Sequence, residues 1–375
     1  MLDLHETQKE SQYEVMIALC DLLASVLSEE LSCGQKSNLD WASLSKLASF
    51  TKTVGIVRYA VDKAGLDIPD AIRAEFKAVK AQTLAKNFQN LASTLQVVEI
   101  LEQADIPCLA YKGAVRSFGV YKKWDMRTSA DIDILVKPSD YEAARKTLKA
   151  NGYLNIVSPL SDWWHVHLGE SPYVRSDRVG PIVDLHHRLQ QPGGPFPAYE
   201  EDFFTEAVTV EFGSRSLKTL SPEDSMLLTA ISYGKALRSG SPWLKEAHEI
   251  ASVYSSANAS ERQKFLTRAQ RQGLSRLYRQ ALGNSLALFD INDGEAFASG
   301  DKSELLHLAF GKQNHHHFFR SQQLWGWLDG NFVTRCTKLI GGLLRVSRSE
   351  RARLREERSG IIKMSRPTIE QRQGA

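Results

Sequence analysis

The sequence predicts an α+β protein in which a small α/β centre lies between two helical regions. Helical periodicity dominates the first hundred residues, strand-like runs follow between Ile106 and Phe212, and helical signals return from Ser221 to about Phe289. We place the boundaries at 1–104 for the N-terminal helical region, 105–219 for the α/β core, 220–334 for the C-terminal helical domain and 335–375 for a basic tail.

The composition is that of an ordinary globular chain. The 375 residues are 42% hydrophobic and 24% charged, which excludes a fibrous or generally disordered protein. No run of about 18 or more uncharged apolar residues occurs, and the first residues lack the features of a secretory signal. The four cysteines are scattered without a C-x-x-C pair, which argues against a zinc ribbon and fits a reducing compartment. We therefore expect a cytoplasmic protein with no transmembrane segment.

The net charge of +3 conceals an uneven distribution. From Arg335 onward, eleven Lys and Arg residues stand against four Glu, so this tail carries +7 and the preceding 334 residues carry −4. A mildly acidic body offers no general attraction for nucleic acid. The arginine-rich segment 345–358 could contact nucleic acid, an anionic membrane surface or an acidic protein, or it could be an ordinary solvated helix.

Local signals justify each element in turn. Pro69 suits the first turn of a long helix that continues to roughly Glu102. Ser139 and Glu142 form a capping-box pattern for a helix that Gly152 is placed to end. Apolar residues spaced as one buried helix face are Val15, Leu19, Leu22, Leu23 and Val26. Strand-like runs occupy residues 106–111, 131–136, 181–189 and 207–212, and Ser221-Pro222-Glu223-Asp224 starts the C-terminal helices.

Asp131 and Asp133 lie two residues apart on a predicted strand, so both side chains point to the same face. Two residues of strand rise separate them by roughly 6.6 Å at the backbone. Carboxylates converging from that distance could hold two Mg²⁺ ions about 3.5–4 Å apart, as in-line phosphoryl displacement requires. A D-x-D pair also occurs on surface strands by chance, so the pattern needs support from its surroundings.

That support comes from the loop before it. Lys112 and Gly113 follow a strand and open a predicted helix, where the glycine permits close backbone approach, the helix N-terminus offers N–H groups and the lysine adds a positive charge to bind phosphate. Arg127 and Ser129 could contact the phosphates or brace the loop. A solvated loop lysine is the alternative for Lys112, and an ion pair with a neighbouring aspartate is the alternative for Arg127.

Asp184 is the best candidate for a third carboxylate. It sits between apolar residues in a strand-like run, where an unpaired charge would be costly to bury, so a metal or basic partner is expected. His186 shares its strand face and could contact the nucleotide or the acceptor, or it could be a packed histidine. Glu170 is a rival third carboxylate, although its context is polar and loop-like.

At these residues the chain resembles the uncharacterised nucleotidyltransferase-like proteins of bacteria, within the DNA polymerase β-type nucleotidyltransferase superfamily. The resemblance rests on Lys112-Gly113, the run Asp131-Ile-Asp-Ile-Leu-Val136 and the later Val183-Asp-Leu-His186. It implies a small mixed-sheet core, Asp131 and Asp133 as paired metal ligands, Asp184 as the third acidic residue and Lys112-Gly113 as the phosphate loop. The usual Gly-Ser signature is Lys-Gly-Ala here, which is similar to a variant in nucleotidyltransferase-type bacterial toxins.

The sequence therefore predicts a Mg²⁺-dependent nucleotidyltransferase that binds two ions and an NTP, with Lys112, Gly113, Arg127, Ser129 and His186 at the nucleotide. The expected acceptor is a hydroxyl or phosphate of a small molecule, peptide or protein, and nucleic acid is possible but not favoured. A toxin-like transferase acting on RNA or protein and a degenerate nucleotide-binding regulatory module are the alternatives.

Overall fold

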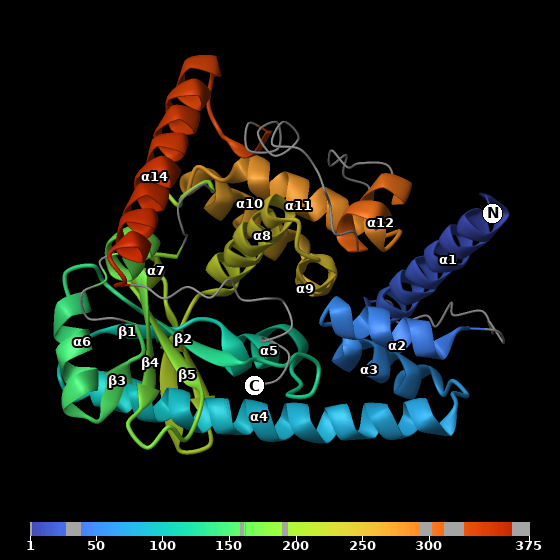
Figure 1. Ribbon diagram of the computed structural model, residues 1–375, viewed down its shortest axis with the longest axis horizontal. Helices are drawn as coiled ribbons and strands as arrows, with labels where there is room; N and C mark the ends of the chain where they lie inside the picture. The colour runs from blue at the N-terminus through green and yellow to red at the C-terminus, as the bar shows by residue number, and fades with distance from the viewer. Residues whose placement is uncertain are drawn as a thin grey trace.

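A five-stranded mixed sheet lies between a long helix and a layer of C-terminal helices (Figure 1). This arrangement confirms the predicted α+β class. The computed structural model describes residues 2–27, 39–157, 161, 163–189, 194–292, 302–310 and 326–361.

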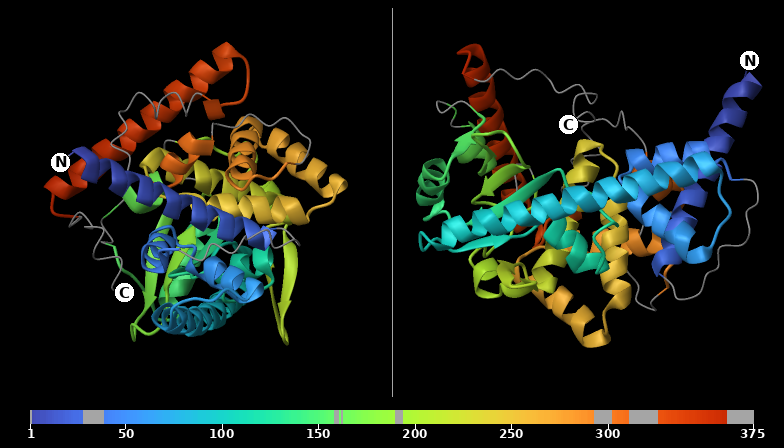
Figure 2. Two further views of the ribbon diagram at one scale, coloured as in Figure 1. Left: turned by 90° about the vertical axis from the view of Figure 1, so that its right-hand side faces the viewer. Right: turned by 90° about the horizontal axis from the view of Figure 1, so that it is seen from below.

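The N-terminal region is helical, as predicted. Its described part contains α1 (Leu2–Leu27), α2 (Trp41–Phe50), α3 (Val54–Ala64) and α4 (Asp70–Glu102). Pro69 is the residue that caps α4 and not a member of its first turn. The 33 residues of α4 pass along one side of the sheet and pack against β1, β2 and α6, and Figure 2 shows this helix crossing the whole width of the molecule.

The sheet has the strand order β1-β2-β5-β4-β3. Only β2 and β5 run parallel among these strands, and every other neighbouring pair is antiparallel. Because β2 and β5 are parallel and in register, Asp133 lies directly opposite Asp184. The strands are β1 (Cys108–Ala110), β2 (Asp131–Val136), β3 (Tyr153–Asn155), β4 (Glu170–Arg175) and β5 (Ile182–His186).

Two local predictions are wrong. Glu170 is the first residue of β4 and not part of a loop, and it pairs with His186 across the sheet. The Ser139–Glu142 capping box does not form: Asp140 occupies the N-cap of α6, and Glu142 instead bonds Arg145 at 2.7 Å. An i,i+3 ion pair competes for the glutamate that a capping box would require.

The remaining core elements surround the sheet. A two-stranded hairpin of β6 and β7 lies beside β1, and its first strand matches the predicted run 207–212. The elements are α5 (Gly113–Tyr121), α6 (Tyr141–Ala150), the π-helix η1 (Trp163–Leu168), α7 (Asp202–Thr205), β6 (Val208–Phe212) and β7 (Arg215–Thr219).

The C-terminal helices begin where the sequence predicts. The Ser221 side chain accepts a hydrogen bond from the Asp224 backbone N–H at 3.1 Å, and Pro222 occupies the first helical position. The helices are α8 (Pro222–Ser239), α9 (Leu244–Ser256), α10 (Ala259–Arg271), α11 (Ser275–Leu288), α12 (Lys302–Phe310) and α14 (Phe332–Arg358). None of the helices in the described ranges is long and apolar enough to cross a membrane.

Two apolar clusters hold the molecule together. One fills the space between the sheet and the helices α4 and α6, around Val97, Ile134 and Leu148. The other is shared by the N-terminal and C-terminal helices, and it joins Leu23 of α1 to Trp243 and Leu282. The N-terminal and C-terminal helical regions therefore share one hydrophobic core. The predicted domain boundaries stay a prediction.

His248 of α9 lies in the interface between these two helical regions. It is fully buried, its Nε2 donates to the Leu23 carbonyl of α1 at 3.1 Å, and its Nδ1 accepts from the Tyr121 hydroxyl at 3.1 Å. Burial lowers the pKa of His248 to about 4, against an ordinary value of 6.5. The folded protein thus holds this imidazole neutral.

We expect this histidine to make the protein acid-labile. Above pH 6.5 the imidazole is neutral in both the folded and the unfolded chain, so the free energy of unfolding is at its full value. As the pH falls toward 4, the unfolded chain binds a proton that the folded chain does not, and the free energy of unfolding should be lower by about 2 kcal/mol at pH 4.5. Urea unfolding at pH 7.5 and 4.5 measures the loss. His248→Gln keeps a donor and an acceptor but cannot titrate, so its stability should fall less between the two pH values. An equal fall in both proteins would contradict this role of His248.

Candidate active site

The loop between β1 and α5 is held close to the start of β2. Lys112 is extended, and Gly113 adopts a φ of +66°, a conformation that favours glycine. A Cβ at Gly113 would lie 3.3 Å from both the Asp131 carbonyl oxygen and the Ser129 hydroxyl. The same hydroxyl donates to the Asp131 carbonyl at 2.8 Å. Ser129 therefore lies beside Gly113, and its predicted contact with the nucleotide stays a prediction.

Asparagines of α4 fix the segment that leads into β2. Asn87 donates to the backbone carbonyls of Trp124 and Arg127 at 2.6 and 2.7 Å, and Asn90 donates to the Ser129 carbonyl at 2.9 Å. Both asparagines are fully buried, so these bonds are shielded from water. The long N-terminal helix thus positions the beginning of the acidic strand.

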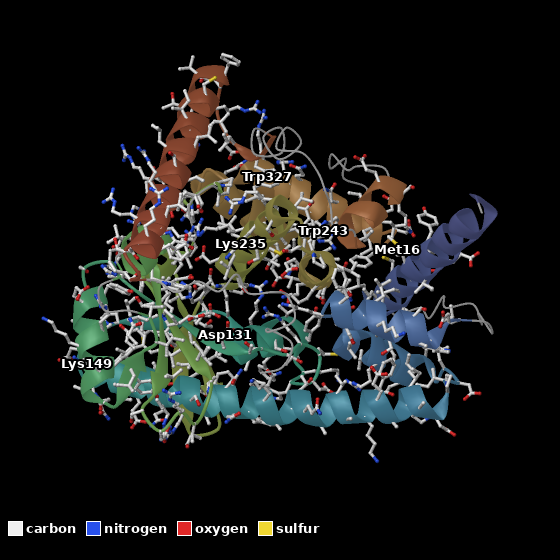
Figure 3. All side chains as sticks on the ribbon, in the orientation of Figure 1. Met16, Asp131, Lys149, Lys235, Trp243 and Trp327 are labelled. Carbon is white, nitrogen blue, oxygen red and sulfur yellow. The ribbon has the colours of Figure 1, made fainter. Side chains whose placement is uncertain are left out.

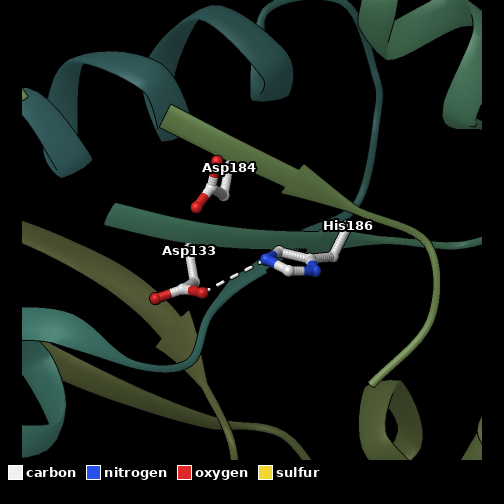
Figure 4. A group of neighbouring side chains, drawn as sticks. All are labelled: Asp133, Asp184 and His186. Atoms are coloured by element: carbon white, nitrogen blue, oxygen red, sulfur yellow. Dashed lines mark hydrogen bonds and ion pairs between the residues drawn. The ribbon is translucent and has the colours of Figure 1, made fainter. Parts of the chain in front are cut away.

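Asp133, Asp184 and His186 converge on one face of the sheet (Figure 4). Potential ligand atoms of these three side chains all lie within 4.8 Å of one another. The His186 Nε2 lies 3.1 Å from the Asp133 Oδ1, and its Nδ1 lies 3.4 Å from the Glu170 Oε2. The parallel pairing of β2 with β5 creates this cluster, because it aligns residues that are 51 to 53 positions apart in the sequence.

Lys112 completes the cluster from the phosphate-loop side. Its Nζ donates to the Asp133 Oδ1 at 2.9 Å. Burial opposes ionisation of Asp133, but the Lys112 ammonium and the hydrogen bond from His186 outweigh burial and hold the pKa of Asp133 well below its ordinary value. Burial likewise opposes the charge on Lys112, and Asp133 raises the Lys112 pKa above its ordinary value. Lys112 is therefore not the solvated loop lysine of the alternative interpretation.

Asp184 has the opposite electrostatic environment. Burial raises its pKa to about 7, and although His186 opposes this shift, the carboxylates of Asp133, Asp131 and Glu170 add to it. A carboxyl group in this environment gains from a nearby cation or exchanges a proton near neutral pH.

Asp131 lies at the start of the same strand, outside the three-residue cluster. It shares the β2 face with Asp133, is only half-buried and contributes to the raised pKa of Asp184. Its assignment as a metal ligand stays a prediction, as do the roles of the other site residues predicted from the sequence.

Arg127 contacts the helical domain. Its Nε lies 3.0 Å from a Glu249 carboxylate oxygen on α9, and Arg116 of α5 binds the other oxygen at 2.8 Å. Burial opposes ionisation of Glu249, but Arg127 and Arg116 outweigh it and lower the pKa of Glu249 to about 2. The expected alternative for Arg127 was an ion pair with a neighbouring aspartate, whereas the partner in the structure is 122 residues further along the chain.

Sequence reasoning missed Arg188 and Lys235, two cationic side chains at the site. A cavity of about 70 Å³ lies between the sheet and α8, and Lys112, Glu170, His186, Arg188 and Lys235 contribute to its lining. Lys235 makes no ion pair with any described residue, and desolvation together with the Lys112 charge lowers its pKa. Figure 3 labels Lys235 on α8, on the side of the helices that faces the sheet. The sequence signal that could have identified Lys235 is its position as the single lysine within the largely apolar run Met226–Leu237.

The donor set fits a divalent cation. Two carboxylates offer the oxygen ligands that Mg²⁺ and Mn²⁺ prefer, and an imidazole nitrogen favours Mn²⁺ over Mg²⁺. Four carboxyl groups gather here, and burial together with the charges of three of them raises the pKa of the fourth, Asp184. Asp133, Asp184 and His186 are therefore a possible metal site.

Comparison with known proteins agrees with this chemistry. A family model described as "Uncharacterised nucleotidyltransferase" matches residues 37–290. The match includes most of the N-terminal helical region, the whole sheet and the helices α8 to α11, and it confirms the resemblance seen at residues 112–186. No curated protein matches the chain.

Proposed function

Because the chain belongs to the uncharacterised nucleotidyltransferase family, whose members transfer phosphorus-containing groups, we propose that it moves a nucleoside monophosphate from an NTP to an acceptor and releases pyrophosphate. The observation that carries the proposal is the cluster of Asp133, Asp184 and His186 beside the Lys112-Gly113 loop. The acceptor that we propose is a hydroxyl or phosphate of a small molecule, peptide or protein.

Nucleotidyltransferases generally use a divalent metal, and we propose two Mg²⁺ ions held by Asp131, Asp133 and Asp184. When bound, such ions lower the pKa of the attacking group and neutralise charge that develops on the transferred phosphate. The prealigned β2–β5 pair supports this assignment, because its carboxylates need little reorganisation to meet one ligand. His186 orients Asp133 through their contact at 3.1 Å.

The triphosphate is proposed to lie against the cationic cavity. Lys112 and the first N–H groups of α5 would contact it from the loop, while Arg188, two residues after β5, and Lys235 of α8 would contact it from the other side. A volume of about 70 Å³ has room for several water-sized groups, such as phosphate oxygens. The positive charges would stabilise both the bound triphosphate and the departing pyrophosphate.

Asp184 is proposed to accept the acceptor's proton. The acceptor oxygen forms a bond to the α-phosphorus, the bond from that phosphorus to the bridging oxygen of pyrophosphate breaks, and the acceptor's proton moves to a carboxylate. Burial raises the pKa of Asp184 in the metal-free protein, and a carboxylate with a raised pKa accepts a proton more readily than an ordinary aspartate. The cluster of carboxyl groups argues against the alternative of a degenerate regulatory module. These groups repel one another, and a protein without catalytic activity would gain nothing from keeping them together.

Labelling with α-³²P NTPs tests the function. The protein is incubated with each labelled NTP, Mg²⁺ or Mn²⁺ and a cell lysate, and the label is then followed in small-molecule, protein and RNA fractions. Label in the small-molecule or protein fraction supports the proposed acceptor, and label in RNA supports the toxin-like alternative. Absence of transfer with all four NTPs and both metals would argue against a nucleotidyltransferase.

Lys235 provides a test of the triphosphate position. We expect Lys235→Met and Lys112→Ala each to weaken binding of a non-hydrolysable NTP by about tenfold, because each removes one charged contact to phosphate. Isothermal titration measures the affinity. Lys149→Met on α6, at an exposed position away from the cavity, is the matched control and should bind like the wild type. Unchanged affinity of Lys235→Met would remove α8 from the nucleotide site.

A further inference from the structure

The helix α14 leaves the body of the molecule along part of its length. Its C-terminal half packs on η1, where the buried Glu356 accepts hydrogen bonds from Ser161 and the Trp163 backbone and Ser349 accepts one from the Trp163 indole. Its N-terminal half extends away from the sheet (Figures 1 and 2). The helix is thus anchored at one end and exposed at the other.

The exposed half of α14 carries an apolar stripe. The exposed fractions are 72% for Phe332, 70% for Val333, 58% for Ile340, 56% for Leu343 and 49% for Leu344. These positions recur at helical spacing and therefore lie on one side of the helix. Leu354 of the same helix is also exposed, at 41%, so six of the exposed large apolar residues of the described chain belong to α14. A stripe of this kind indicates an interaction surface.

Toward the anchored end, the same side of α14 becomes basic. By helical spacing, Arg348, Arg351, Arg355 and Arg358 continue the stripe, and none of the four pairs with a carboxylate among the described residues. Across Phe332–Arg358 there are eight Lys and Arg against three Glu. The partner must therefore be apolar where it meets residues 332–344 and anionic where it meets residues 348–358.

We propose that α14 binds the surface of a membrane that contains anionic lipids. The apolar stripe would enter the acyl boundary, and the arginines would contact phosphate headgroups, as in other interfacial helices. A second copy of this chain would cover the apolar stripe but would supply no anionic surface to the four arginines, because the same segment of the copy is also basic. The proposal does not rest on the nucleotidyltransferase activity, because α14 lies outside the matched residues 37–290.

Vesicle sedimentation of the full chain tests the proposal. We expect binding to vesicles of phosphatidylcholine with 30% phosphatidylglycerol at least tenfold stronger than to phosphatidylcholine alone, and weaker binding at 0.5 M salt. The double variant Ile340→Asp/Leu343→Asp tests the apolar stripe, and Arg348→Ser/Arg355→Ser tests the basic continuation. Each should reduce binding to the anionic vesicles at least tenfold.

Matched controls separate α14 from general surface effects. Val179→Asp changes an exposed apolar residue on the β4–β5 turn, and Lys146→Ser/Lys149→Ser removes two exposed charges from α6. Both should bind vesicles like the wild type. Three results would overturn the proposal. The protein could bind the two vesicle types equally, the α14 variants could bind like the wild type, or the protein could be a dimer in light scattering and not bind vesicles. The last result would assign the stripe to a second copy.

Discussion

Asp133→Asn is expected to abolish nucleotide transfer while the chain remains folded. Asp133 is the point where the Lys112 ammonium and the His186 imidazole meet, at 2.9 and 3.1 Å. The amide keeps the shape of the side chain but removes the charge that would hold a metal and position Lys112. Losing one group that supports electrostatic stabilisation of the transition state typically costs at least about a hundredfold in rate.

Transfer of α-³²P label and circular dichroism together measure this result. Asp131→Asn should also lose transfer if Asp131 is a metal ligand. Asp67→Asn, a change of the same kind at a fully exposed carboxylate, is the control and should transfer at the wild-type rate. Near wild-type turnover of Asp133→Asn with Mg²⁺ would refute the two-metal mechanism, and restoration of activity by Mn²⁺ alone would point to weakened metal affinity.

Glu249→Gln is expected to destabilise the fold by about 3 kcal/mol. This change leaves two arginines, Arg116 and Arg127, without their buried counter-charge, and breaking a buried ion pair on one side is costly. The urea midpoint should fall without a change in the slope of the transition. Because Arg116 belongs to α5 and also bonds Ser225 and Thr229 of α8, the loss loosens the phosphate-loop helix from the helical domain.

A surface ion pair supplies the control for Glu249. Glu99 lies 3.5 Å from Arg215, and both side chains are more than half exposed. Glu99→Gln should therefore change the free energy of unfolding by less than about 1 kcal/mol. If both variants unfolded at the wild-type urea concentration, the Arg116–Glu249–Arg127 cluster would not be a stabilising link between the core and the helices.

The chemistry of the site was readable from local sequence because it depends on short-range patterns. A strand has a side-chain period of two, so Asp131 and Asp133 had to share a face once their run was recognised as β. The carboxyl group of Asp184 inside an apolar run predicted a metal or a basic partner. The structure places this group in one cluster with Asp133 and His186, but Asp184 forms no ion pair with any described residue, so this expectation stays a prediction. The start of the helix at Ser221 could also be predicted from local sequence, because the capping hydrogen bond joins residues only three positions apart.

What the sequence alone did not determine depends on contacts between distant segments. Strand register brings Asp133 opposite Asp184 and turns Glu170 toward His186, and no local pattern specifies which strands become neighbours. The pairing of Arg127 with Glu249 and the approach of Lys235 to the cavity follow from how the C-terminal helices dock on the sheet. Periodicity is fixed by the geometry of a single element, whereas register and docking are fixed by the packing of the whole core, which only the tertiary structure decides.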